Sequence, residues 1–197
     1  MHIVLASQSP SRRMILNQAG VEPLIHPADV DEDAIIRQLQ GAEPAEIVTR
    51  LALAKAEAIA PDFPDDVVIG GDSMLLLDGE LQGKPHTPEA TITRWKQQRG
   101  RTAHLITGHA IVLGEKKVVE AVQTTIHFAD ATDRDIEAYA HSGEPLQCAG
   151  AFTLEALGGW FIDAIEGDPS SVIGLSLPTV RKALYSFGLN ASDFWTR

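Results

Sequence analysis

The sequence predicts a mixed protein of the α/β or α+β class, organised around one main sheet. Three observations predict this class: short apolar runs that suit buried strands, amphipathic segments with helical spacing between them, and turn residues that separate the two kinds. No internal repeat, low-complexity tract or linker interrupts the 197 residues. We therefore expect a single domain over residues 1–197.

The first elements place an arginine beside the start of a helix. Residues 2–6 form an apolar run typical of a buried strand, and Ser9 followed by Pro10 is typical of a helix N-terminus. On the helix that follows, Arg12 falls within the apolar face. Free backbone N–H groups, the hydroxyls of Ser7 and Ser9, and an inward guanidinium would together bind an anion. The alternative is an ordinary capped helix with a surface arginine.

An acidic run and a helix with an inward lysine follow. Residues 29–33 are typical of a solvated loop or a helix start, and they would help to form a metal site only if folding brings them near Asp72. The clearest helix covers residues 44–60, and Lys55 lies near the middle of its apolar face. Such a lysine either extends its ammonium group to water or meets a phosphate or a carboxylate.

Over residues 67–85, a buried strand is expected to carry an acid at its end, and a hairpin is expected to bring back a base. The apolar run 67–71 ends at Asp72, and a second run at residues 74–77 turns back towards Lys84. One carboxylate and one ammonium group placed in this way suit a cleft that handles phosphate and a metal ion.

The remaining elements are predicted from the same patterns. Helices are expected at residues 87–99, 132–141 and 177–187, and strands at residues 23–27, 104–113, 118–128, 148–154 and 160–165. The seven histidines lack the spacing of metal ligands, so no histidine metal site is expected.

Composition argues against several classes of function. The formal net charge of −11 argues against a protein that binds DNA or RNA through phosphates, and against binding to an anionic membrane. A single cysteine, Cys148, excludes an internal disulfide and a cysteine-rich metal site. No apolar run approaches the ~20 residues that span a bilayer, and the N-terminus lacks the features of a signal peptide. We therefore expect a cytoplasmic protein.

Short motifs follow one another in a defined order along nearly the whole chain. They are LASQSPSR at 5–12, VDE at 30–32, ALAKA at 52–56, GGDS at 70–73, GKP at 83–85, TG at 107–108, SGE at 142–144, AG at 149–150 and VIGL at 172–175. With these motifs the chain resembles the Maf nucleotide pyrophosphatases, also called septum-formation inhibitors. The departure is Ser11, where many members have the first arginine of a pair; Arg12 matches the second, and Arg13 partly compensates.

The resemblance implies an inosine-triphosphatase-like fold, in which a twisted mixed sheet is flanked by helices in two lobes with the active cleft between them. It implies the reaction NTP + H2O → NMP + pyrophosphate with a divalent metal, Mg²⁺ or Mn²⁺. Asp72 would be the general base, Glu32 its metal-binding or charge-shaping partner, and Lys84 a catalytic cation. The implied substrate contacts are Ser7, Ser9, Arg12, Arg13, Lys55 and Lys84.

The same resemblance also gives an indication of which nucleobase the substrate carries. Family members whose A-G-A-Y/F-x-x-Q segment ends in Gln resemble enzymes of dTTP and UTP, and those with Glu resemble enzymes of 7-methyl-GTP. This chain has Glu155 at that position. A carboxylate accepts two hydrogen bonds, as from the N1–H and amino group of guanine, so Glu155 favours a guanine-type base if it faces the substrate. The alternative is that Glu155 points to solvent.

The resemblance also suggests a homodimer and leaves a second class of function open. The same residues could bind a nucleotide without hydrolysing it, in a catalytically silent regulator of cell division. The intact set of Asp72, Glu32, Lys55 and Lys84 argues against a silent site. Release of pyrophosphate in the presence of Mg²⁺ would distinguish the two.

Overall fold

A computed structural model describes residues 1–196 of the chain as a mixed α/β structure. It contains a seven-stranded sheet in the order β2-β1-β3-β5-β6-β7, and β4 pairs with β3 outside this path. Strand β1 runs parallel to β2 and β3, whereas β4 is antiparallel to β3 and β7 is antiparallel to β6. The sheet is therefore mixed, and the predicted fold class is confirmed.

The strands are β1 (Ile3–Leu5), β2 (Leu24–Ile25), β3 (Val67–Leu77), β4 (Glu80–Gln82), β5 (Thr102–Leu113), β6 (Lys116–Phe128) and β7 (Ile162–Glu166). The α-helices are α1 (Pro10–Gln18), α2 (Glu32–Gln38), α3 (Pro44–Ile59), α4 (Pro88–Gln98), α5 (Asp133–His141), α6 (Pro169–Ile173) and α7 (Leu177–Ser186). Short 3-10 helices are η1 (Ala60–Asp62), η2 (Glu144–Gln147), η3 (Ala149–Ala151), η4 (Leu157–Phe161) and η5 (Ala191–Phe194). Within the described residues, no helix combines the length and apolar character needed to cross a membrane.

The chain forms two compact units. Within the described residues, unit 1 consists of Met1–Asp72, Thr107–Val122 and 174–196, and unit 2 of Ser73–Ile106 and Gln123–Ile173. Strands β3, β5 and β6 each contribute residues to both units. Each unit has its own cluster of buried apolar side chains.

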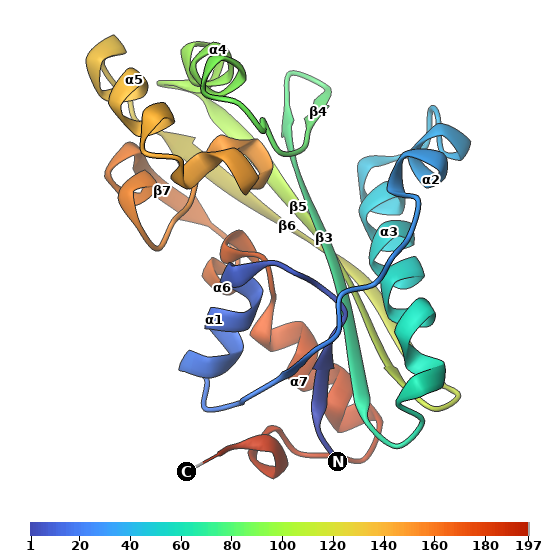
Figure 1. Cartoon of the computed structure of the whole chain (residues 1–197). Helices are drawn as coiled ribbons and strands as arrows, with labels where there is room; N and C mark the ends of the chain where they lie inside the picture. The colour runs from blue at the N-terminus through green and yellow to red at the C-terminus, as the bar shows by residue number, and fades with distance from the viewer. Residues whose placement is uncertain (197) are drawn as a thin grey trace. The chain divides into compact units, whose positions relative to one another are not determined.

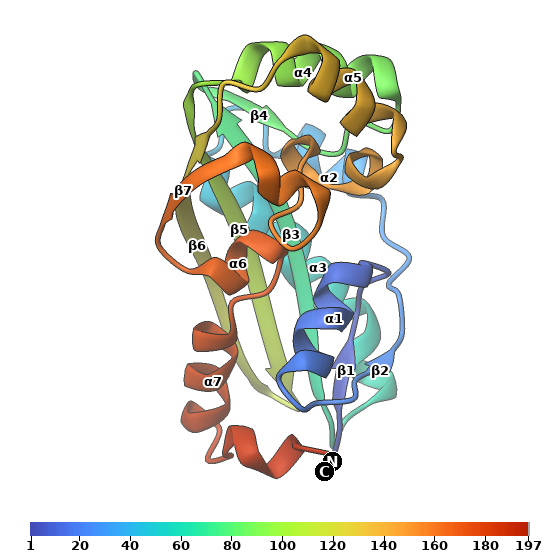
Figure 2. The same ribbon diagram turned by 90° about the vertical axis from the view of Figure 1, so that its left-hand side faces the viewer.

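In unit 1, α3 lies on one face of the strands, and α1 and α7 lie on the other (Figures 1 and 2). Helix α3 approaches the sheet very closely, because a Cβ at Gly70 would lie 2.1 Å from the carbonyl oxygen of Ala52, and one at Gly108 would lie 2.3 Å from the backbone of Val48. The interface between α3 and the sheet is accordingly built from small side chains, including Ala52 and Ala56. The glycines therefore set the distance between α3 and the sheet.

In unit 2, α4 and α5 lie side by side (Figures 1 and 2). The fully buried Trp95 of α4 makes edge-to-face contacts with Phe128, Tyr139 and Phe161. Its indole N–H donates to the carbonyl oxygen of Ala151 at 2.7 Å, which satisfies the polar edge of the ring. Trp95 thus joins α4, α5 and the irregular segment that follows α5.

Most of the predicted elements are confirmed, with two corrections. Strand β3 does not end at Asp72 but continues to Leu77. Residues 148–154 form no strand: they contain the short helix η3, since Gly150 and Ala151 have φ values of +69° and +59° that no strand permits.

Candidate active site

Asp72 lies within β3 and is buried, with 9 % of its surface exposed. Side chains two residues apart on a strand share a face, so Asp72 points to the same side as Gly70, where α3 crosses the sheet. The close approach that Gly70 allows therefore brings the side chains of α3 within reach of Asp72.

Lys55 is the α3 side chain that meets Asp72. Its Nζ lies 2.8 Å from Oδ1 of Asp72 and 3.0 Å from Oε1 of Glu32. Lys55 is 9 % exposed, which confirms that it points inward as its position on the helix predicts. Of the two alternatives for an inward lysine, the structure favours the one in which the ammonium group meets a carboxylate.

Glu32 reaches this ammonium group from the first residue of α2. The helix begins there because the side chain of Asp31 caps it, accepting from the backbone N–H of Ala34 at 2.8 Å. The acidic run is thus a helix start, and folding does bring it to the side chain that also binds Asp72. The Glu32 side chain keeps 48 % of its surface exposed, so water and solutes can reach its carboxylate.

Arg12 is buried on α1, with 8 % of its surface exposed, as the helical pattern predicts. Its Nε donates to the carbonyl oxygen of Gly174 at 2.8 Å, and its Nη1 donates to Oγ of Ser7 at 3.0 Å. The guanidinium lies against β3, since a Cβ at Gly71 would lie 3.0 Å from Nε of Arg12. Its charge acts on both Asp72 and Glu32, and these two carboxylates partly offset the effect of burial, which lowers the pKa of Arg12.

The pKa of Asp72 is raised above its ordinary value. Burial is the largest cause, because it penalises the carboxylate form; the charges of Lys55 and Arg12 work in the opposite direction, and Glu32 adds to the rise. A carboxyl group whose pKa lies above the usual range accepts a proton more readily than an exposed aspartate would. The buried pair of Lys55 and Asp72 therefore suits proton transfer as well as charge stabilisation.

The serines lie at the start of α1. Ser9 caps the helix, accepting from the backbone N–H of Arg12. Oγ of Ser7 accepts from the backbone N–H of Ser9 at 3.2 Å and from Arg12, so both contacts leave the Ser7 hydroxyl hydrogen to donate elsewhere. The prediction that Ser7, Ser9 and Arg12 lie together is confirmed.

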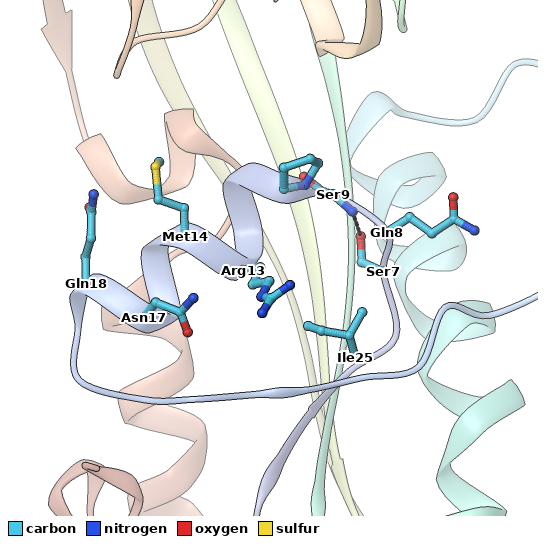
Figure 3. Close-up of a pocket in the computed structure, with 9 residues that line it drawn as sticks. Ser7, Gln8, Ser9, Arg13, Met14, Asn17, Gln18 and Ile25 are labelled. Atoms are coloured by element: carbon cyan, nitrogen blue, oxygen red, sulfur yellow. Dashed lines mark hydrogen bonds between the residues drawn. The ribbon is translucent and has the colours of Figure 1, made fainter. Parts of the chain in front are cut away.

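Arg13 is directed differently from Arg12. It is exposed and lines a cavity of about 350 Å³ beside α1 and β2 (Figure 3). Its cavity-lining neighbours are Ser7, Gln8, Ser9, Pro10, Met14, Asn17, Gln18 and Ile25. Arg13 therefore lies near the same two serines as Arg12, but its side chain is exposed whereas that of Arg12 is buried.

In unit 2, Lys84 and Glu155 are both exposed. Lys84 follows Gly83, whose carbonyl oxygen accepts from Nη1 of Arg94 at 2.5 Å and from the N–H of Gly150 at 3.2 Å. The charges of Glu155 and Lys84 both act on the Cys148 thiol, so the two side chains belong to one neighbourhood of unit 2. Glu155 Oε2 accepts from the backbone N–H of Leu154 at 3.0 Å.

Two parts of this arrangement were not predicted from the sequence. One is the carbonyl oxygen of Gly174, which holds Arg12 at a backbone position with φ of +123° that favours glycine. The other is the hydrogen-bonded environment of Glu144 in unit 2. In the sequence, Gly174 and Glu144 are marked only by their places in the short motifs VIGL and SGE.

Asp72 is buried, has a raised pKa and is paired with the buried Lys55, and a carboxyl group perturbed in this way marks a candidate functional site. The family model described as Maf-like protein matches residues 2–187, and the chain belongs to the Maf family. Curated relatives named nucleoside triphosphate pyrophosphatase include those of Corynebacterium efficiens and Corynebacterium glutamicum strain R. The first is 87% identical over all of both chains, and the second is 75% identical over 99% of each.

More distant relatives carry the same name. The nucleoside triphosphate pyrophosphatase of Nocardia farcinica is 53% identical, covering 98% of this chain and 96% of its own length. Among solved structures, the Staphylococcus aureus Ham1 protein aligns over 66% of this chain and 73% of its own, with a TM-score of 0.44 and 19% identity. On the strength of its curated relatives, the chain is an enzyme of the hydrolase class.

Proposed function

We propose that this protein hydrolyses nucleoside triphosphates between the α- and β-phosphates, giving the nucleoside monophosphate and pyrophosphate. The observation that carries the proposal is the buried contact between Lys55 and Asp72, with Glu32 and Arg12 beside it. The shared name of the curated relatives supports the same reaction.

Asp72 is the proposed general base. Water that attacks the α-phosphorus must lose a proton, and a buried carboxylate with a raised pKa is suited to take it. Attack builds negative charge on the phosphate oxygens and on the leaving pyrophosphate, and fixed cations stabilise that charge. In unit 1, Lys55 and Arg12 are the proposed cations, and the hydroxyls of Ser7 and Ser9 are proposed to donate to phosphate oxygens.

Two further cations are proposed to contact the triphosphate. Arg13 is exposed beside the same serines, which supports a contact that partly replaces the arginine missing at Ser11. Lys84 is exposed in unit 2 and belongs to the G-K-P motif that carries the resemblance to the family, which supports a role in binding the triphosphate. Neither side chain is proposed to move a proton.

A divalent cation, Mg²⁺ or Mn²⁺, is proposed to act with Asp72 and Glu32. Oxygens of these two carboxylates converge on the Lys55 ammonium group at 2.8 and 3.0 Å, which marks a position that already favours positive charge. Within residues 1–196, no group of three or more His, Cys, Asp or Glu side chains could hold a metal alone. Two carboxylates completed by substrate phosphates are nevertheless a usual set of ligands for Mg²⁺, so the residues fit the ion. When bound, it would neutralise charge on the phosphates.

For the nucleobase, we propose a guanine-type substrate such as 7-methyl-GTP. Glu155 is exposed, so its carboxylate is accessible to a substrate, and its place at the end of the A-G-A-F-x-x-E segment supports the contact. The carboxylate would accept from the N1–H and amino group of the base. Preference of the purified protein for dTTP or UTP over 7-methyl-GTP would contradict this assignment.

The reaction is tested by measuring pyrophosphate release from a panel of 7-methyl-GTP, GTP, dTTP and UTP with Mg²⁺. In Asp72→Asn, turnover should fall by about 10²–10³-fold or more, because the carboxamide cannot accept the proton. Asp65→Asn is the matched control, since Asp65 is exposed in the same unit. Near-normal turnover by Asp72→Asn would reject the assignment of the base. A wild-type protein that binds these nucleotides but releases no pyrophosphate would instead favour a silent regulator.

The predicted homodimer and the predicted cytoplasmic location stay predictions. Light scattering of the purified protein tests the first, and fractionation of cells tests the second.

A further inference from the structure

Glu144 forms the centre of a hydrogen-bonded cluster in unit 2 that the proposed reaction does not use. The carboxylate accepts from the backbone N–H groups of Leu157 at 3.1 Å and Gly158 at 3.0 Å. It also accepts from the hydroxyl of Thr153, and from the hydroxyl of Tyr139 at 3.2 Å. One side chain thus receives four donors from α5 and from both ends of the segment 153–158.

Tyr139 strengthens the same connection. Its hydroxyl oxygen accepts from the backbone N–H of Thr153 at 3.1 Å while its hydroxyl hydrogen is donated to Glu144. The ring is buried in the core of unit 2, where it contacts Trp95 edge-to-face, so the hydroxyl has a fixed position. The start of segment 153–158 is therefore attached to the core through two neighbouring acceptors.

The segment is folded tightly against this cluster. A Cβ at Gly158 would lie 2.4 Å from the carbonyl oxygen of Thr153 and 2.5 Å from the hydroxyl of Tyr139, so only glycine brings the N–H of residue 158 to Glu144 without displacing the backbone. Thr153 and Gly158 are both buried, whereas Glu155 between them is exposed. The segment is thus held at both ends and presents Glu155 at its middle.

The charge of Glu144 is what allows it to accept so many donors. Burial alone would raise its pKa, but the hydrogen bonds from Thr153, Gly158, Leu157 and Tyr139 outweigh burial and lower it. Glu144 therefore remains a carboxylate at neutral pH, and both of its oxygens accept: Oε1 meets the donors of Tyr139, Thr153 and Gly158, and Oε2 meets that of Leu157. An amide at this position has one acceptor oxygen and would turn its NH2 group towards an N–H donor.

We propose that Glu144 is a positioning residue for recognition of the nucleobase: by holding segment 153–158 it fixes the direction in which Glu155 meets the base. The inference rests on the proposed function, because it concerns the substrate preference of that same site. Glu144 acts through Glu155 and does not itself touch the substrate. Its loss should therefore affect discrimination between bases more than the hydrolytic step.

The test compares wild type with Glu144→Gln and with the milder Thr153→Val, which removes one donor. The measurement is kcat/KM for pyrophosphate release from 7-methyl-GTP, GTP, dTTP and UTP. In Glu144→Gln, the ratio between the best and the worst substrate should fall by about tenfold, mainly through a higher KM for the best one. Thr153→Val should change the ratio in the same direction by less. Glu137→Gln, an exposed glutamate on the neighbouring α5, is the matched control and should leave the ratio unchanged.

A merely structural role is separated from positioning by a double-variant cycle with Glu155→Ala. If Glu144 acts through Glu155, then Glu144→Gln should change the substrate ratio little once Glu155 has been replaced. Hydrogen exchange at the amides of Leu157 and Gly158 gives a readout independent of activity, since both should exchange faster in Glu144→Gln.

The outcomes distinguish the inference from the proposed function. An active wild type whose substrate ratio is unchanged in Glu144→Gln and Thr153→Val would overturn the inference alone. So would additive effects of Glu144→Gln and Glu155→Ala, or unchanged exchange at the two amides. If Glu144→Gln does not fold, Thr153→Val decides by itself. A wild type that hydrolyses none of the nucleotides would overturn the proposed function, and the inference with it.

Discussion

Lys55 places one positive charge between the carboxylates of Asp72 and Glu32, and both Lys55 and Asp72 are buried. Replacing it by Met keeps most of the side-chain volume but leaves Asp72 buried without its nearest cation. Breaking a buried ion pair on one side typically costs about 3–5 kcal/mol. We expect Lys55→Met to lower the free energy of unfolding by about that amount near pH 8, as measured by urea denaturation.

The sign of the pH dependence follows from the raised pKa of Asp72. In Lys55→Met the pKa of Asp72 rises further, so folded Asp72 keeps a proton at pH values where unfolded Asp72 has lost it. The free energy of unfolding therefore declines as the pH increases from the unfolded pKa of Asp72 to its folded pKa. The loss should therefore be smaller near pH 5 than near pH 8, and Asp72→Asn should rescue much of it. Lys117→Met is the control, since its exposed pair with Glu57 should contribute less than about 1 kcal/mol. Equal losses in the two lysine variants would contradict the argument.

At the scale of elements, the distance between α3 and the sheet decides whether Lys55 reaches Asp72. A Cβ at Gly70 would lie 2.1 Å from the backbone oxygen of Ala52, and a backbone atom cannot rotate away as a side chain can. Gly70→Ala should therefore displace α3 and lower the unfolding free energy by at least about 1–3 kcal/mol. Thermal unfolding of the two proteins measures this loss. Gly83→Ala is the control, because a Cβ at Gly83 would meet nothing within 4 Å and its φ is not positive. A Gly70→Ala protein as stable as Gly83→Ala would refute the close-approach argument.

The elements also show what a sequence can and cannot predict. Helical spacing placed Arg12 and Lys55 inward, because the phase of an amphipathic helix follows directly from the order of its residues. The spacing alone could not predict that Glu32 shares the Lys55 ammonium group, since that contact depends on the path of the chain between α2 and α3.

The irregular part of unit 2 was predicted least well. Apolar residues around Gly150 resembled a strand, but positive φ values at Gly150 and Ala151 make a turn that no short-range pattern announces. The hydrogen bonds around Glu144 join residues up to fourteen positions apart without a repeating spacing, so local patterns carry no signal for the cluster. For the same reason, the proposed role of Glu155 rests on the family resemblance.

At the scale of the whole molecule, two groups of unit 2 should make the protein sensitive to alkaline pH. Burial raises the pKa of Cys148 to about 11, with the charges of Glu155 and Glu144 adding to the rise and that of Lys84 opposing it. Burial likewise raises the pKa of Tyr139. Unperturbed thiols and phenols titrate near about 8.5 and 10, so the unfolded chain loses these protons first. By linkage, the stability that each group contributes is fully present while the pH is below the pKa of that group in the unfolded chain, and it declines as the pH rises above that pKa.

The midpoint of thermal unfolding should therefore fall by several degrees as the pH increases from about 8 to about 10.5, with the first part of the fall due to the thiol. Cys148→Ala removes that proton, so its midpoint should decline less than that of wild type below about pH 10, whatever its stability at neutral pH. Tyr139→Phe should differ from wild type chiefly above about pH 10, where the unfolded phenol ionises. Repulsion within a chain of net charge −11 acts equally on wild type and both variants. If the unfolding midpoints of wild type and Cys148→Ala decline in parallel with pH, then net charge causes the loss of stability at alkaline pH and the buried thiol does not.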